Sequence, residues 1–140
     1  MTGMDVLRRV RAYDTDMARL RLRLACARDA ATRITRSTDT TGHGGMVDKM
    51  GEHAAKVDQI EREMAARRAV YERDVLEAAR LIGEMEPLQG RVMHLRMMRG
   101  MTVRQTAGEM KTSEGSVKGL FRRGREALES VRIPQRGCDE

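Results

Sequence analysis

The stretch of residues 102–128 reads T-V-R-Q-T-A-G-E-M-K-T-S-E-G-S-V-K-G-L-F-R-R-G-R-E-A-L. Thr102 and Ser113 are hydroxyl residues of the kind that begin a helix, because their oxygen accepts a free backbone N–H of the first turn. We therefore predict one helix over residues 103–110 and a second helix over residues 114 to about 130.

Only Lys111 and Thr112 separate these two predicted helices, which leaves room for a tight turn. The small residue Ala107 lies where the helices would cross. Two helices joined in this way form a helix-turn-helix, in which the second helix of the pair enters the major groove of DNA. The side chains expected to face the core are Ala107, Met110, Val117, Leu120 and Leu128.

A shorter helix is predicted ahead of this motif. Pro87 either ends the preceding helix or begins a new one in its first turn, and Gly100 suits the cap that ends a helix. We place the module at residues 87–133 and a flexible tail at residues 134–140. The apolar positions of the shorter helix are Leu88, Val92, Leu95 and Met98.

The letters L-R-M-M-R-G-M-T, from Leu95 onward, and R-E-A-L, which ends the quoted stretch, resemble region 4 of bacterial sigma-70 factors. That module reads the −35 element of promoters, so the resemblance implies binding to double-stranded DNA. It covers about a third of the chain. The positions that carry it are Gly100, Thr102, Ala107, Met110, Ser113, Ser116, Val117 and the segment Arg125–Leu128.

Three departures from the family's pattern bear on the module. Thr106 and Thr112 stand where the family usually has Ile or Val, so the core is expected to be less apolar. Lys111 stands where Gly or Asn is common, and a left-handed backbone would strain a lysine there. Gly115 and Gly119 stand where relatives carry groove-facing side chains, so phosphate contacts and DNA shape are expected to matter more than base contacts.

The resemblance, together with Lys118 and the arginines that follow it on the third helix, defines the expected DNA contacts. Ser116 and Lys118 are the candidates for reading bases, and Arg122 and Arg123 the candidates for binding phosphate, because arginine binds phosphate or guanine in a bidentate way. The full set of expected contact residues is Arg104, Ser113, Glu114, Gly115, Ser116, Lys118, Gly119, Arg122 and Arg123.

The front of the chain carries a heptad pattern, with apolar residues spaced alternately by four and three. A helix of about thirty residues, roughly 45 Å long, cannot bury such a seam alone. Residues 35–45, which are rich in Thr and Gly, are expected to form a loop. The first seam is Val6, Val10, Tyr13, Met17, Leu20, Leu24, Ala27, Ala31 and Ile34.

A second long helix is predicted from about Met46 to Met85, and its repeat is expected to be interrupted at Arg67 and Arg68 by a stutter. The predicted fold is thus all-α, with an antiparallel, coiled-coil-like helical hairpin over residues 1–86 followed by the three-helix module. A dimer with intermolecular helix pairing is the alternative. The second seam is Met46, Met50, His53, Val57, Ile60, Met64, Tyr71, Val75, Ala78, Ile82 and Met85.

The charge of +6 is unevenly spread along the chain. Residues 1–36 hold nine Arg and four Asp, residues 37–86 hold seven basic and eleven acidic side chains, and residues 87–140 hold eleven basic and six acidic side chains. A basic terminal segment beside an acidic middle favours a polyanionic partner at one end. No metal-ligand spacing, nucleophile-base set or long apolar run is present, so we expect neither enzyme activity, cofactor nor membrane span, and a cytoplasmic location.

The leading functional hypothesis is a DNA-binding transcription regulator whose front end pairs with a second copy or docks on RNA polymerase. Its layout is similar to small phage and prophage activators of the ArpU/RinA type, which suggests a phage or prophage origin. One alternative is a small terminase subunit, which also joins a helix-turn-helix to oligomerising helices but usually carries it first in the chain. Another is a structural coiled-coil protein.

Overall fold

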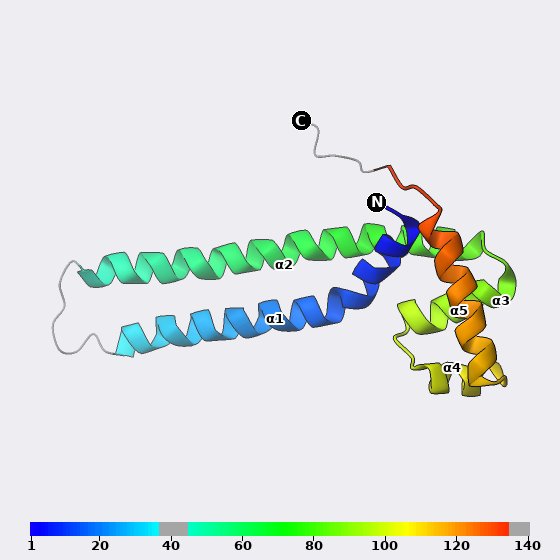
Figure 1. Cartoon of the computed structure of the whole chain (residues 1–140). Coiled ribbons are helices and arrows are strands. Elements are labelled where there is room, and N and C mark those ends of the chain that lie inside the picture. Colours follow the sequence, from blue (N-terminus) through cyan, green and yellow to red (C-terminus); the bar gives the residue numbers. More distant parts are fainter. Residues whose placement is uncertain (37–44, 135–140) are drawn as a thin grey trace. The chain divides into compact units, whose positions relative to one another are not determined.

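The protein is all-α, as the sequence predicts. A computed structural model describes residues 1–36 and 45–134. Within these residues the only β-type pairing is an isolated bridge between Thr2 and Arg132. The helices are α1 (Gly3–Arg36), α2 (Gly45–Gly83), α3 (Pro87–Met93), the π-helix η2 (His94–Met98), α4 (Val103–Met110) and α5 (Glu114–Glu129) (Figure 1).

The chain divides into two compact units. Met1–Tyr13 packs with the chain from Tyr71 onward, and we call this part the helix-turn-helix unit. Asp14–Val70 forms the other part, which we call the hairpin unit. This division does not coincide with the predicted boundary at Pro87, because the start of α1 and the end of α2 belong with the module.

The hairpin unit is an antiparallel helix pair formed by α1 and α2 (Figure 1). As the residue number rises along α1, the number of its partner on α2 falls, which defines the antiparallel direction. Residues 16–28 of α1 are thus paired with residues 61–67 of α2 within one chain. The ion pairs that join them are Asp16–Arg67 (3.3 Å), Arg23–Glu63 (3.0 Å) and Arg28–Glu61 (2.9 Å).

The predicted seam lies inside this pair. Met17, Leu24 and Ile60 are buried, and Leu20 and Val57 are half-buried. The prediction that Met50 lies in the seam is wrong, because this residue is 44% exposed. The side chains of Ile34 and Met46, like most of the predicted loop at residues 35–45, lie outside what the structure describes.

The expected stutter in α2 is absent. Ile60, Met64, Arg67 and Tyr71 follow one another at spacings of four, three and four, so the repeat runs on without interruption. The Arg67 side chain takes the seam position and is only 19% exposed. Arginine can do so because its aliphatic stem packs like an apolar side chain while its guanidinium binds a carboxylate, here that of Asp16.

The core of the helix-turn-helix unit draws on four helices and on η2. The first turns of α1 and the last turns of α2 pack against α3, η2 and α5, so the N-terminal residues help to form the module. Its buried cluster consists of Met4, Val6, Leu7, Val10, Ala78, Leu81, Met93, Met97 and Leu128. A second, smaller cluster holds the motif itself together, with Val92, Ala107 and Val117 at its centre.

The start of α1 is also fastened to the chain that follows α5. Gly3 N donates to the Val131 carbonyl over 2.9 Å, and Ile133 N donates to the Met1 carbonyl over 2.9 Å. These backbone bonds pair residues that lie far apart in the sequence. The two bonds flank the isolated bridge and hold residues 1–3 against residues 131–133.

Candidate nucleic-acid interface

The helix α4 begins at the predicted cap. Thr102 Oγ1 accepts from Gln105 N over 3.1 Å, and Gln105 Oε1 accepts from Thr102 N over 3.0 Å. This reciprocal arrangement is a capping box, which satisfies two backbone donors at the helix start. The sequence pattern therefore located this helix end correctly.

The turn between α4 and α5 is a Schellman motif. Thr112 N donates to the Ala107 carbonyl over 3.0 Å, and Lys111 N donates to the Gly108 carbonyl over 3.3 Å. Lys111 has φ 54° and ψ 47°, which is the left-handed conformation. The left-handed backbone that the sequence resemblance suggests at this lysine is therefore present, and a residue with a Cβ is expected to be less stable there than glycine.

Replacing this lysine should therefore stabilise the unit. Lys111→Gly removes the Cβ from the left-handed position and is expected to raise the free energy of unfolding by about 1 kcal/mol. Urea unfolding followed by circular dichroism measures the change. Lys111→Ala is the matched control, since it removes the charge and keeps the Cβ. Equal stability of the two variants would show that the turn is not strained.

The helix α5 begins at Ser113, as predicted. Ser113 Oγ accepts from Ser116 N over 3.1 Å and donates to Ser116 Oγ over 3.0 Å. Val117 and Leu128 are almost completely buried on its inner face, at 0% and 1% exposure. The hydroxyl of Ser113 thus satisfies a backbone donor in the first turn of α5. Residues 113–116 at this helix end are exposed.

One of the three glycines in α5 lies in a tightly packed position. A Cβ on Gly124 would lie 3.0 Å from both Cγ and Sδ of Met93, which is itself 0% exposed. The glycine lets α5 approach that methionine closely. Gly115 and Gly119 have room for a Cβ, so they weaken the helix without such a packing reason.

The polar residue in the module core is satisfied. Thr106 is 0% exposed, and its Oγ1 donates to the Thr102 carbonyl over 2.8 Å. The bond removes the cost of burying a hydroxyl without a partner. Thr112 is exposed, so of the two expected departures only Thr106 makes the core less apolar.

The helix before the motif departs from the predicted pattern. Its second half is the π-helix η2, in which Arg99 N donates to the carbonyl of His94, five residues back, over 3.1 Å. Val92 and Leu95 are buried as predicted, and Met93 and Met97 are buried as well. Leu88, predicted to face the core, is 54% exposed. Gly100 follows with φ +67°, consistent with its predicted capping role.

Arg96 joins the three helices of the module. Its Nη1 donates to the Met101 carbonyl over 2.6 Å, directly before the cap of α4. Its guanidinium carbon lies 5.2 Å from the centre of the Phe121 ring on α5, which is a cation–π contact. Sequence reasoning gave this residue no role.

The nine predicted contact residues all belong to the helix-turn-helix unit. Gly119 is half-buried, and the others are exposed. Lys118, Arg122 and Arg123 have no ion-pair partner within residues 1–36 and 45–134. Arg104 lies separately on α4.

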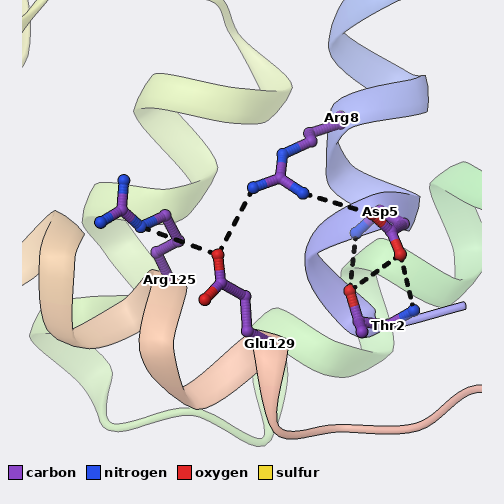
Figure 2. A network of polar contacts seen from close by, with 5 residues as sticks. All are labelled: Thr2, Asp5, Arg8, Arg125 and Glu129. Atoms are coloured by element: carbon purple, nitrogen blue, oxygen red, sulfur yellow. Dashed lines mark hydrogen bonds and ion pairs between the residues drawn. The ribbon is translucent and has the colours of Figure 1, made fainter.

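A polar network fastens α5 to the start of α1 (Figure 2). Asp5 Oδ2 accepts from Thr2 N over 2.8 Å, and Arg8 bridges Asp5 Oδ1 (3.2 Å) and Glu129 Oε1 (3.4 Å). Arg125 Nε lies 3.9 Å from the same Glu129 oxygen. The hydrogen bonds from Thr2 hold the pKa of Asp5 below its ordinary value. This stabilisation is present above the ordinary carboxyl pKa and is lost as the pH falls through the lowered one.

Neither a metal site nor a membrane span is found in the described part of the chain. None of its helices is both long and apolar enough to cross a bilayer. No group of three or more His, Cys, Asp or Glu side chains there is placed to hold a metal ion.

Comparison with known proteins assigns the C-terminal module. Residues 76–128 match the family model for sigma-70, region 4. The match covers less than half of the chain and includes the end of α2 together with α3, η2, α4 and most of α5. Searches of curated proteins and of solved structures gave no match. The module is therefore a region 4-like helix-turn-helix, a DNA-binding class of domain.

Proposed function

We propose, from this region 4-like module, that the protein is a transcription regulator that contacts promoter DNA through α5. The observation that carries the proposal is the pair of exposed, adjacent arginines on α5, Arg122 and Arg123, which have no ion-pair partner in the described chain. Cations on the exposed face of the second motif helix are suited to the phosphates that line the major groove.

The helix α5 has a buried face and an exposed face, and the exposed face is the one proposed to meet DNA. Val117, Gly124 and Leu128 are buried. At 100° per residue, Gly119, Arg122 and Arg123 lie on the opposite side of the helix. Small side chains near the N-terminal end let the backbone come close to the groove, and the arginines one turn later reach toward phosphate.

The proposed roles differ along the helix. Ser116 and Lys118 lie in the first turns, where the side chains of a recognition helix reach base edges. Arg122 and Arg123 serve as phosphate contacts that set position and affinity rather than sequence preference. Ser113 acts mainly as the helix cap. Glu114, Gly115 and Gly119 contribute close approach, and Arg104 adds a contact from α4.

A salt titration tests this mode of binding. If Arg104, Arg122 and Arg123 each neutralise one phosphate, the logarithm of the association constant should fall against the logarithm of salt concentration with a slope of roughly −2.7. Fluorescence anisotropy of a labelled duplex of random sequence measures it. Binding that is independent of salt, or a failure to bind duplex DNA at low salt, would contradict the proposal.

The hairpin unit is proposed as the part that meets protein partners, either RNA polymerase or a second copy of the chain. Its two helices bury few apolar side chains, and Leu22 on α1 is 66% exposed. Leu22 lines a mainly apolar hollow on the hairpin unit together with Ala27 and Ile60, and such a hollow suits further packing. Sedimentation of the full chain distinguishes a dimer from a monomer, and a monomer would favour RNA polymerase as the partner of the hairpin unit. A phage or prophage origin remains a prediction.

A further inference from the structure

The hairpin unit carries a mainly apolar hollow between α1 and α2, with a volume of about 520 Å³. Leu22, Cys26 and Ala27 line it from α1, and Gln59 and Ile60 line it from α2. The hollow is open to solvent, since Leu22 is 66% exposed and the thiol-bearing Cys26 is exposed as well. An apolar surface of this kind is stabilised when another surface covers it.

The core of the hairpin unit is small. Among its described side chains, the apolar ones that are buried are Met17, Leu24 and Ile60. A helical unit of fewer than about 70 residues rarely gains enough stability from one small core, and packing against a further chain is a common way to enlarge it. Two antiparallel helix pairs that pack face to face form a four-helix bundle, in which each pair covers the open side of the other.

The charges at the two ends of the hollow are complementary to each other. Lys56 and Glu63 are seven residues apart on α2, so they share one face of the helix, with Gln59 and Ile60 between them. Lys56 is exposed and has no ion-pair partner among the described side chains. Glu63 binds Arg23 through Oε2 over 3.0 Å, and its other carboxylate oxygen can accept from a second cation.

We propose that the hairpin unit binds a second copy of this chain at the hollow, about a two-fold axis that crosses α2 near Gln59. In a two-fold interface the same surface is used twice, so that residue i of each copy contacts residue j of the other. The axis places Lys56 opposite Glu63 of the partner subunit twice over, and Leu22 and Cys26 become covered. This inference rests on the part of the proposed function that gives the hairpin unit a protein partner, and it does not depend on DNA binding.

The first test compares two substitutions of exposed leucines in the full chain. Leu22→Asp places a charge in the proposed interface. Leu76→Asp is the matched control, because it places the same charge on α2 in the other unit, at a side chain that is 74% exposed. Sedimentation over a concentration series should show a dimer for the parent and for the control. The dimer of Leu22→Asp should be at least about tenfold weaker, with unchanged helicity.

The second test reverses charges to examine the two-fold arrangement. In a dimer of Lys56→Glu two acidic pairs face each other, and in a dimer of Glu63→Lys two cationic pairs do. Each variant alone should therefore dimerise at least about tenfold more weakly than the parent. An equimolar mixture should form a heterodimer, because both of its pairs are opposite in sign. A fluorescent label on one variant detects it in sedimentation. Helicity is checked, since Glu63→Lys also removes the ion pair with Arg23.

The outcomes separate this inference from the DNA-binding role. A parent that stays monomeric at its highest soluble concentration overturns the inference, and duplex binding by that monomer leaves the DNA-binding role in place. Equal dimerisation of the parent and Leu22→Asp overturns it too, because the copies would then pair elsewhere. Folded reversal variants that do not associate in the mixture contradict the two-fold arrangement. A dimer that meets every expectation but binds no duplex supports the inference and contradicts the DNA-binding role.

Discussion

Leu7→Ala is expected to lower the free energy of unfolding of the helix-turn-helix unit by about 2–5 kcal/mol. Leu7 is 0% exposed and lies in one buried cluster with Met93 of α3 and Leu128 of α5. Truncating it leaves a cavity beneath the proposed recognition helix, and the tightly packed neighbours can only partly fill the space. Urea unfolding, with hydrogen exchange of the α5 amides, measures the loss.

Leu76→Ala is the matched control for this prediction. It makes the same substitution in the same unit, at a side chain on α2 that is 74% exposed, so its cost should be within about 0.5 kcal/mol. If Leu7→Ala leaves the exchange protection of α5 unchanged, the first turns of α1 are not part of the unit. The substitution thus tests the division of the chain at Tyr13 and Tyr71.

The helix-turn-helix could be predicted closely because local chemistry defines its ends. Thr102 and Ser113 cap α4 and α5 as their positions in the sequence suggest, and Lys111 adopts the left-handed turn that the resemblance implies. Each of these features depends on neighbours a few residues away. The DNA contacts assigned to α5 remain predictions, since they depend on a partner outside the chain.

The role of the N-terminus could not be predicted from its spacing alone. A heptad pattern shows that a stripe is buried but not what covers it. One signal was available, since Met4 and Leu7 widen the stripe of Val6 and Val10 beyond a two-position seam. Such a wide apolar face is typical of a helix in a globular core. The same helix forms a narrower seam after Tyr13.

Two further departures arise where a charged side chain or a close approach at a glycine breaks a simple pattern. Arg67 fills a seam position because its guanidinium pairs with Asp16. A pattern built from apolar residues alone therefore predicts a break at that position. Leu88 is exposed at the start of α3, where the residue that packs inward is Gly90, whose Cα lies so near the Ile82 carbonyl that a Cβ would be 2.9 Å from its oxygen. Both effects depend on tertiary partners.

The second large effect is expected from Arg122→Ala combined with Arg123→Ala. Both side chains are exposed on α5 without an ion-pair partner in the described chain, so their removal should leave the fold and the melting temperature almost unchanged. Binding to duplex DNA at low salt should fall about tenfold for each arginine, or about a hundredfold together. The salt slope should become shallower by about two.

The control for this pair is Arg19→Ala combined with Arg21→Ala. These arginines are exposed on α1 in the hairpin unit and have no ion-pair partner within the described residues. The substitution removes the same charge from the whole protein but none from α5. It therefore separates contact with DNA from a general effect of net charge, which also attracts DNA over longer distances.

The most direct measurement is an anisotropy titration of one labelled random-sequence duplex with the parent and these two double variants, at low salt and with helicity checked for each protein. We expect tight binding by the parent, binding within about threefold of the parent by the α1 variant, and roughly a hundredfold weaker binding by the α5 variant. Equal binding by all three folded proteins would contradict it, because α5 would then not be the surface that meets DNA.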